Sequence, residues 1–182
     1  MPDTALLIID MQRALLKDAH DGEACLDRVA ELAERARAAG VPVVYLRQRF
    51  DQVPPEWLEV HPTLTPRPGD VVLDKDSADS FLGTALGEVL AGLAVHRLVV
   101  TGYASDYCVD STSRSALSHG YDLVLVADGH TTIERPAGAE PTAAQIVAHH
   151  NGIFSVIQYA GRSVAVTPAA EIRFTASPQS PT

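Results

Sequence analysis

The stretch that decides the fold reads LVVTGYASDYCVDSTSRSALSHGYDLVLVAD over residues 98–128. It opens with a short apolar run, Leu98–Thr101, which is typical of a strand buried on both faces. After Gly102 a polar turn leads into a helix, and Gly120 is the glycine expected just past a helix C-terminus. Tyr121–Ala127 is a second apolar strand. The order strand, turn, helix, strand predicts two parallel strands joined by a right-handed crossover.

Cys108 lies where the polar turn, Tyr103–Tyr107, becomes the helix. Amide groups at a helix N-terminus are unpaired, and the helix dipole there favours an anion. A thiol in this place is expected to have a lowered pKa and to act as a nucleophile. The same amides could stabilise an oxyanion. A small residue packed under the sheet explains a free cysteine equally well, so this stretch alone leaves both interpretations open.

Length, composition and net charge limit the classes of protein to which this chain can belong. The 182 residues suit one substantial core, and 46% of them are apolar. A net charge of −9 disfavours nucleic acid or an anionic membrane as a partner, and no apolar run is long enough to span a bilayer. Cys25 and Cys108, the only cysteines, have no metal-type spacing. We predict a soluble cytoplasmic protein with one domain over residues 1–174 and a disordered tail over 175–182.

Polar residues follow two further predicted strands. Asp10 ends the apolar run Thr4–Asp10, and Lys75 follows the short strand Asp70–Asp74. Ligands bind at the carboxyl ends of the strands in open α/β sheets, so these two residues and Cys108 are expected to meet. An aspartate there can instead cap a helix, and a lysine can be a solvated charge.

An aspartate, a lysine and a cysteine expected at one edge of the sheet together favour a catalytic role. Asp10 can transfer the proton of the thiol, Lys75 can stabilise the thiolate, and Cys108 can attack a carbonyl. His130 is the only histidine expected after a strand at this edge, which disfavours a cysteine–histidine pair.

The remaining elements alternate between helical and strand patterns. They are a helix over Asp21–Ala39, a strand over Val41–Leu46, a helix over Thr84–Leu93, a loop over Asp128–Glu140, a helix over Pro141–Gly152 and a strand over Ser163–Thr167. The proline-rich segment Arg47–Asp70 is expected to be a loop that shapes a substrate pocket.

Four segments together resemble the isochorismatase-like cysteine hydrolases. They are LLIIDMQ (6–12), DKDSADSF (74–81), TGYASDYCV (101–109) and GYDLVLVAD (120–128), and the similarity covers about residues 4–167 in the expected order. The resemblance implies a three-layer α/β/α doubly wound, Rossmann-like fold with a six-stranded, mainly parallel sheet. It also implies the catalytic triad Asp10, Lys75 and Cys108, and a homo-oligomer such as a dimer or tetramer.

The resemblance further implies how the oxyanion is held. A non-proline cis peptide is expected between Tyr103 and Ala104, and it aims the Ala104 amide, with that of Cys108, at the developing oxyanion. Six residues are expected from their positions to bind substrate: Gln12, Phe50, Trp57, Phe81, Tyr103 and Tyr107.

The implied activity is hydrolysis of a C–N bond in a small amide, cyclic amide or carbamoyl compound through a thioester. No cofactor is expected. Nicotinamidases of the family carry an Asp-x-His metal motif where this chain reads LRQRFD (46–51), so no metal is expected either. Two alternatives stay open. One is vinyl-ether hydrolysis of an isochorismate-like diacid held by Arg47 and Arg49. The other is a catalytically silent subunit that binds a partner.

Overall fold

Six strands form one sheet in the order β3-β2-β1-β4-β5-β6, and each pairing between them is parallel. The computed structural model describes residues 3–174, so the predicted tail over 175–182 lies outside the described residues. The strands are β1 (Thr4–Ile9), β2 (Val43–Gln48), β3 (Val71–Lys75), β4 (Arg97–Tyr103), β5 (Asp122–Thr131) and β6 (Val164–Thr167). The expected six-stranded, mainly parallel sheet is confirmed.

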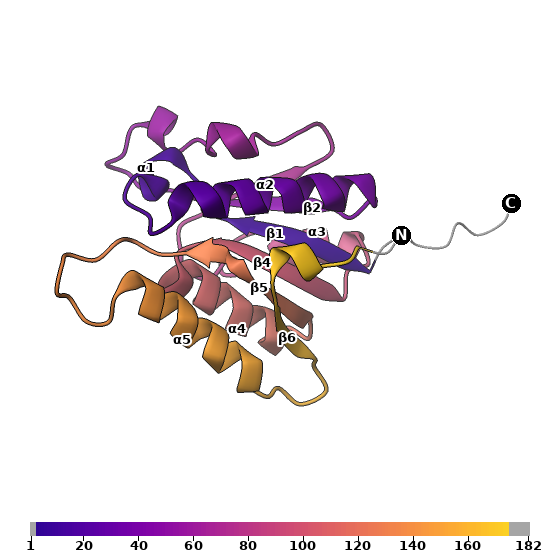
Figure 1. The fold of residues 1–182 in the computed structure, drawn as a ribbon. Coiled ribbons are helices and arrows are strands. Elements are labelled where there is room, and N and C mark those ends of the chain that lie inside the picture. The colour runs from indigo at the N-terminus through magenta and orange to yellow at the C-terminus, as the bar shows by residue number, and fades with distance from the viewer. Residues whose placement is uncertain (1–2, 175–182) are drawn as a thin grey trace, which may run out of the picture.

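Helices lie on both faces of the sheet (Figure 1). They are α1 (Arg13–Leu16), α2 (Gly22–Ala38), α3 (Leu86–Gly92), α4 (Asp110–Ser118) and α5 (Ala143–Val156). Short turns are η1 (Pro55–Trp57), η2 (Pro62–Leu64) and η4 (Ala169–Glu171), which are 3-10 helices, and η3 (Ser105–Val109), which is π-helical. Between residues 3 and 174, no helix is both long and apolar enough to cross a membrane.

Alternation along β1 separates two cores. Leu6 and Ile8 pack with α2 on one face, whereas Leu7 and Ile9 pack with residues of α3, α4 and α5 on the other. Successive side chains of a strand point to opposite faces, so an apolar run such as β1 can serve both cores at once. The result is the expected three-layer α/β/α arrangement.

The strand order creates a switch point beside β1. The chain runs from β1 outward to β2 and β3, and then returns to β4 on the other side of β1. In doubly wound folds this reversal opens a crevice at the carboxyl ends of the two central strands. Residues that follow β1 and β4 therefore face a common space.

Gly102 allows β4 to approach β1 closely at this edge. It pairs with Ile9, and its φ is +130°. A Cβ atom at this position would lie only 2.1 Å from the Ile9 carbonyl oxygen. Only glycine fits this backbone conformation at this spacing, because it has no Cβ atom. Gly102 therefore allows the turn after β4 to lie next to the end of β1.

β5 differs from the sequence prediction. It was expected to end at Ala127, with a loop from Asp128, but it continues to Thr131. The register shifts after Val100, and pairing resumes with Gly102 opposite His130. The turn-like residues therefore form an irregularity within the strand and not its end, and His130 reaches the edge of the sheet near β4. The predicted polar turn before Cys108 is likewise partly helical, because η3 begins at Ser105.

Candidate active site

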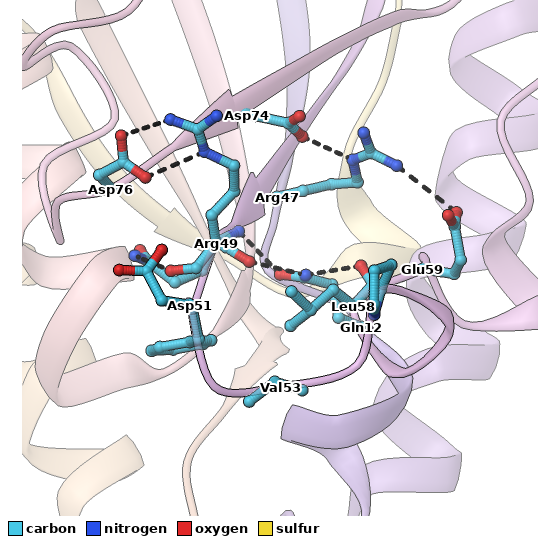
Figure 2. Close-up of a pocket in the computed structure, with 12 residues that line it drawn as sticks. Gln12, Arg47, Arg49, Asp51, Val53, Leu58, Glu59, Asp74 and Asp76 are labelled. Atoms are coloured by element: carbon cyan, nitrogen blue, oxygen red, sulfur yellow. Dashed lines mark hydrogen bonds and ion pairs between the residues drawn. The ribbon is translucent and has the colours of Figure 1, made fainter.

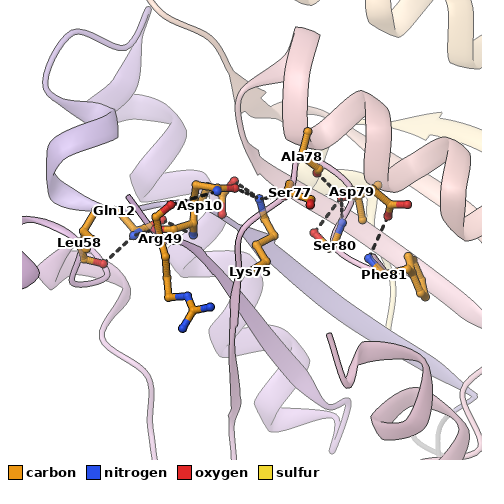
Figure 3. A network of polar contacts seen from close by, with 12 residues as sticks. Asp10, Gln12, Arg49, Leu58, Lys75, Ser77, Ala78, Asp79, Ser80 and Phe81 are labelled. Atoms are coloured by element: carbon orange, nitrogen blue, oxygen red, sulfur yellow. Dashed lines mark hydrogen bonds and ion pairs between the residues drawn. The ribbon is translucent and has the colours of Figure 1, made fainter. Parts of the chain in front are cut away.

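Asp10 and Lys75 form a buried ion pair. Asp10 follows β1, Lys75 ends β3, and the Lys75 Nζ lies 2.7 Å from the Asp10 Oδ2. Their side chains are 1% and 0% exposed respectively. The strand between them, β2, contributes Gln48, whose Oε1 accepts a hydrogen bond of 2.7 Å from the Lys75 Nζ, and the Ser77 carbonyl accepts another of 3.0 Å. Figure 3 shows the Lys75 side chain directed at Asp10 in this network.

The backbone of Asp10 is held in an unusual conformation. Its φ is +52°, in the left-handed region that L residues other than glycine rarely occupy. Such a conformation costs about 1–3 kcal/mol and persists only where neighbouring contacts enforce it. Here the Asp10 amide donates to the Leu46 carbonyl at 2.8 Å, and the carboxylate is held by Lys75.

Cys108 lies in η3, half-buried beside this ion pair. Burial and the Asp10 carboxylate raise the pKa of the Cys108 thiol to about 12, although the Lys75 ammonium acts in the opposite direction. The lowered pKa expected from a helix N-terminus is therefore wrong. Desolvation and a neighbouring carboxylate both disfavour the thiolate, and together they outweigh the ammonium group.

The Asp10 carboxyl also has a raised pKa. Burial raises it, while the charge of Lys75 and hydrogen bonds to Lys75 and Cys108 lower it. The two groups therefore affect each other: the Asp10 carboxylate raises the pKa of the thiol, and the hydrogen bond with Cys108 lowers the pKa of the carboxyl. Because a raised pKa makes a carboxylate a stronger base, Asp10 is better matched to the thiol than an exposed aspartate is.

We predict opposite effects of Asp10→Asn on two reactions of Cys108. The substitution removes the negative charge that raises the thiol pKa and leaves the Lys75 charge that lowers it. Alkylation by iodoacetamide near neutral pH is therefore expected to become faster than in the wild type, with its pH midpoint shifted downward. Hydrolysis of an amide is expected to be lost, because the proton acceptor is gone.

Mass mapping of alkylated peptides against pH provides the measurement. The buried Cys25 thiol, which is 1% exposed, serves as the unreactive internal reference. Slower alkylation of Cys108 in Asp10→Asn would contradict the electrostatic account.

The turn that holds Cys108 is closed by backbone hydrogen bonds to Ala104. The Ala104 carbonyl accepts from the amides of Tyr107, at 3.0 Å, and Val109, at 3.1 Å. The peptide bond between Tyr103 and Ala104 is cis, as the family resemblance implied. Ala104 is 4% exposed, so the turn is packed against the sheet.

An open cleft of about 870 Å³ lies next to the end of β2, and Asp10, Lys75 and Cys108 are not among its lining residues. Gln48 lines it and also accepts a hydrogen bond from Lys75, which links the cleft to Asp10. Two arginines lie on its wall, and each is paired with an acid: Arg47 Nε lies 2.8 Å from Asp74 Oδ1, and Arg49 Nη2 lies 2.5 Å from Asp76 Oδ2 (Figure 2).

Two residues expected to bind substrate line this cleft. Phe50 is 43% exposed there. Gln12 is fully buried, and its side-chain amide donates to the carbonyls of Gln48, at 2.9 Å, and Leu58, at 2.7 Å. The Gln12 Oε1 accepts from the Gln48 amide at 2.8 Å. Both donors of Gln12 are thus used to tie the loop after β2 to the end of β1.

The other four expected substrate contacts are more scattered. Tyr107 is exposed in η3, next to Cys108, and Tyr103 is half-buried at the end of β4. Trp57 is half-exposed at the end of η1 and does not line the cleft. The Phe81 ring stacks on His119, with ring centroids 4.7 Å apart. His119 follows the C-terminal end of α4, so the structure does not bring Phe81 to the Asp10 cluster.

Gln48 was not among the site residues predicted from the sequence. Its signal was present, since a polar residue ends β2 at the edge that carries Asp10 and Lys75. The predicted contacts at this position were its neighbours Arg47 and Arg49. Within residues 3–174, no group of three or more His, Cys, Asp or Glu side chains is placed to hold a metal ion.

Comparison with known proteins identifies the family. The isochorismatase domain matches residues 4–153. The chain belongs to the isochorismatase family. A streptothricin hydrolase of Streptomyces noursei is 34% identical over 189 residues, which cover 97% of this chain and 67% of that protein. The ureidoacrylate amidohydrolase RutB of Azorhizobium caulinodans is 25% identical over 213 residues, with 93% of each chain covered.

Solved structures of the family have the same fold. The crystal structure of an isochorismatase from Pseudomonas putida KT2440 matches with a TM-score of 0.81 and 27% identity, covering 94% of this chain and 90% of that one. The resemblance inferred from the sequence is therefore confirmed. So is the predicted class of enzyme, because relatives that match most of the chain are named hydrolases or amidohydrolases.

Proposed function

We propose that this protein is a cysteine-dependent amidohydrolase that cleaves a C–N bond in a small amide, cyclic amide or carbamoyl compound. The observation that carries the proposal is the fully buried Asp10–Lys75 pair, 2.7 Å apart, beside the Cys108 thiol at the switch point of the sheet. Removing two opposite charges from water costs desolvation free energy. A buried ion pair next to a nucleophile is therefore typical of a functional site.

The proton of the thiol governs the first step. Cys108 rests as a thiol, because its pKa is about 12. As the sulfur attacks the substrate carbonyl, Asp10 accepts the proton, so that the thiolate never has to accumulate. Lys75 stays charged beside Asp10 and limits the cost of placing negative charge in this buried place. The Gln48 side chain accepts a hydrogen bond from the Lys75 ammonium and helps to hold it in place.

The developing oxyanion requires hydrogen-bond donors. In the proposed mechanism the amides of Ala104, the residue before η3, and of Cys108, within η3, supply them just after the end of β4. Asp10 then returns its proton to the leaving nitrogen, the C–N bond breaks, and a thioester remains on Cys108. Water, deprotonated by Asp10, attacks the thioester and releases the acid and the free thiol.

The relatives indicate which compounds to test. One is named for the hydrolysis of streptothricin and another for that of ureidoacrylate, and both match nearly the whole chain. We propose these two compounds, together with simple carbamoyl compounds, as the first substrates to examine. Gln12 is assigned a positioning role at the edge of the cleft, because its amide donors are engaged with backbone.

The vinyl-ether alternative has less support. It required Arg47 and Arg49 to hold the carboxylates of a diacid, but each arginine is paired with an acid of β3 or its following loop, Asp74 or Asp76. Isochorismate still belongs in the substrate panel, since turnover that survives loss of Cys108 would favour that alternative. The homo-oligomer and the cytoplasmic location stay predictions.

Rapid quenching tests the proposal. The enzyme is mixed with streptothricin, ureidoacrylate or a small carbamoyl compound, quenched in acid, and digested for mass mapping. We expect a covalent acyl group on the Cys108 peptide during turnover and none on the Cys25 peptide. In a second sample Cys108 is first blocked by alkylation. If this enzyme still hydrolyses an amide, and no acyl adduct forms, the cysteine mechanism is contradicted.

A further inference from the structure

A buried chain of hydrogen bonds runs behind the turn that holds Cys108. The Ser105 Oγ lies 2.7 Å from the His130 Nδ1, and the His130 Nε2 lies 3.0 Å from the Asn151 Oδ1. The Asn151 amide donates onward to the Ala127 carbonyl at 2.9 Å. Ser105 is fully buried and His130 is 3% exposed. None of these side chains has a part in the mechanism described above.

The direction of each hydrogen bond follows from the two ends of the chain. Asn151 donates through its nitrogen to Ala127, so its oxygen faces His130. That oxygen can only accept, so the His130 Nε2 carries the hydrogen. Burial lowers the pKa of His130 to about 4, so the ring is neutral and its Nδ1 is an acceptor. The Ser105 hydroxyl therefore donates to His130, and the whole chain has one polarity.

The three residues come from three elements that meet at the edge of the sheet. Ser105 begins η3, His130 lies in β5, and Asn151 lies in α5. Ser105 directly follows Ala104, whose carbonyl closes the turn around Cys108. His130 pairs with Gly102, two residues before Ala104 in the chain. The start of η3 is thus fastened both to the sheet and to the helix behind it.

We propose that Ser105 and His130 are positioning residues that hold the amide of Ala104 where the oxyanion develops. The inference rests on the proposed function, since it needs Cys108 to attack a carbonyl. Loss of the Ser105–His130 hydrogen bond frees the first residue of η3 and lets the Ala104 amide turn away. Neither residue touches Asp10, Lys75 or the thiol in any hydrogen bond of the described residues, so the reactivity of the sulfur itself is left intact.

Two reagents separate these effects. Acetylation by p-nitrophenyl acetate forms a bond between the Cys108 sulfur and the acetyl carbon, passes through an oxyanion, and then expels p-nitrophenolate as the carbonyl re-forms, while Asp10 takes the thiol proton. Alkylation by iodoacetamide displaces iodide at a saturated carbon and forms no oxyanion. Removal of one oxyanion donor costs about 10²–10³-fold in rate, and a donor held less firmly costs part of that. We therefore expect Ser105→Ala to acetylate about 10–100-fold more slowly and to alkylate at the wild-type rate.

Three further variants complete the experiment. His130→Ala is expected to behave like Ser105→Ala, and His130→Asn is expected to recover part of the acetylation rate, because its side-chain oxygen takes the place of the Nδ1 acceptor. Ser115→Ala is the matched control, since Ser115 of α4 lies 3.3 Å from the ring of His119, the residue that follows this helix, on the surface. It is expected to leave both rates unchanged. Melting temperatures are measured for every variant, and rates are compared well below them.

The outcomes distinguish the inference from the proposed function. A selective fall in acetylation in Ser105→Ala, with partial recovery in His130→Asn, supports the inference. Equal changes in acetylation and alkylation, or a lower melting temperature with both rates unchanged, overturn it and leave the proposed function standing. A wild-type enzyme in which neither reagent modifies Cys108 overturns both. Should His130→Ala fail to fold, Ser105→Ala and His130→Asn carry the test, because each is a smaller change.

Discussion

Cys108→Ala is expected to lower amide hydrolysis by about 10⁵-fold or more, to the background rate of the assay. In a covalent mechanism, removing the nucleophile lowers the rate nearly as much as removing all the catalytic residues together. Proton transfer and oxyanion stabilisation cannot act when no atom attacks the carbonyl. The fold is expected to survive, since Cys108 is only half-buried and the substitution removes a single sulfur atom. The measurement is the initial rate on each substrate of the panel, beside the circular dichroism spectrum and melting temperature.

Cys25→Ala is the matched control for this prediction. Cys25 is also a free cysteine, but it lies in α2, is 1% exposed and packs in the core. Its replacement is expected to lower stability and leave the rate of hydrolysis unchanged below the melting temperature. Retention of activity in Cys108→Ala would exclude the thioester mechanism and return attention to the vinyl-ether alternative. Equal losses of activity in both variants would point to unfolding and contradict a specific role for Cys108.

Lys75→Met is expected to lower the free energy of unfolding by about 3–5 kcal/mol and to abolish activity. The substitution keeps a long apolar stem in the core but leaves the Asp10 carboxylate buried without its 2.7 Å partner. The cost of breaking such a pair comes from the charge that stays behind and not from the lost attraction alone. Urea denaturation gives the free energy of unfolding, and the same samples give the rate of hydrolysis.

The loss in Lys75→Met is expected to depend on pH. Burial already raises the pKa of Asp10, and removal of Lys75, which lowers it, raises the pKa further. The folded state then binds a proton that the unfolded chain releases, so stability is greatest below the ordinary aspartate pKa and falls as pH rises through the raised one. The defect of Lys75→Met should therefore be larger in mildly alkaline than in mildly acid buffer. A defect that grows as pH falls would contradict this account.

Two further variants test the origin of the effect. Asp10→Asn combined with Lys75→Met removes both charges and is expected to recover most of the stability but none of the activity. Arg49→Met breaks an ion pair at the same sheet edge, but its partners are 57% and 68% exposed, so the free energy of unfolding is expected to change little. If Arg49→Met lowered the free energy of unfolding as much as Lys75→Met does, burial of the ion pair would not be the cause of the loss.

The meeting of Asp10, Lys75 and Cys108 could be predicted because parallel strands align chemically unlike residues at one edge. Asp10, Lys75 and Cys108 each follow an apolar run, and alternation of helix and strand patterns was enough to place those runs in one sheet. The ion pair between Asp10 and Lys75 depends in addition on the order of the strands. Lys75 lies two strands from Asp10, and it reaches the carboxylate because β2 between them ends in Gln48, which holds the ammonium.

The cleft next to the end of β2 was predicted less well. Its loop was recognised from its prolines, and Phe50 does line it. Phe81 was assigned from its place after the Lys75 segment, but it stacks on His119 because the chain after β3 runs along α4. Aromatic side chains reach several ångströms in any direction that the backbone allows, so position in the sequence does not settle which ring enters a cleft.

By itself the sequence determined the three-layer fold, the parallel sheet and the three strand-end residues, since these follow from apolar periodicity and from the turn after each strand. Only the tertiary structure decided the protonation of Cys108 and the placing of His130. The pKa of a thiol depends on how much water and which charges surround it, and these are set by Asp10 and Lys75 arriving from distant segments. The register of β5 shifts opposite Gly102, at the position where β4 also lies closely against its other neighbour, β1. Both are properties of packed neighbours, which no local pattern encodes.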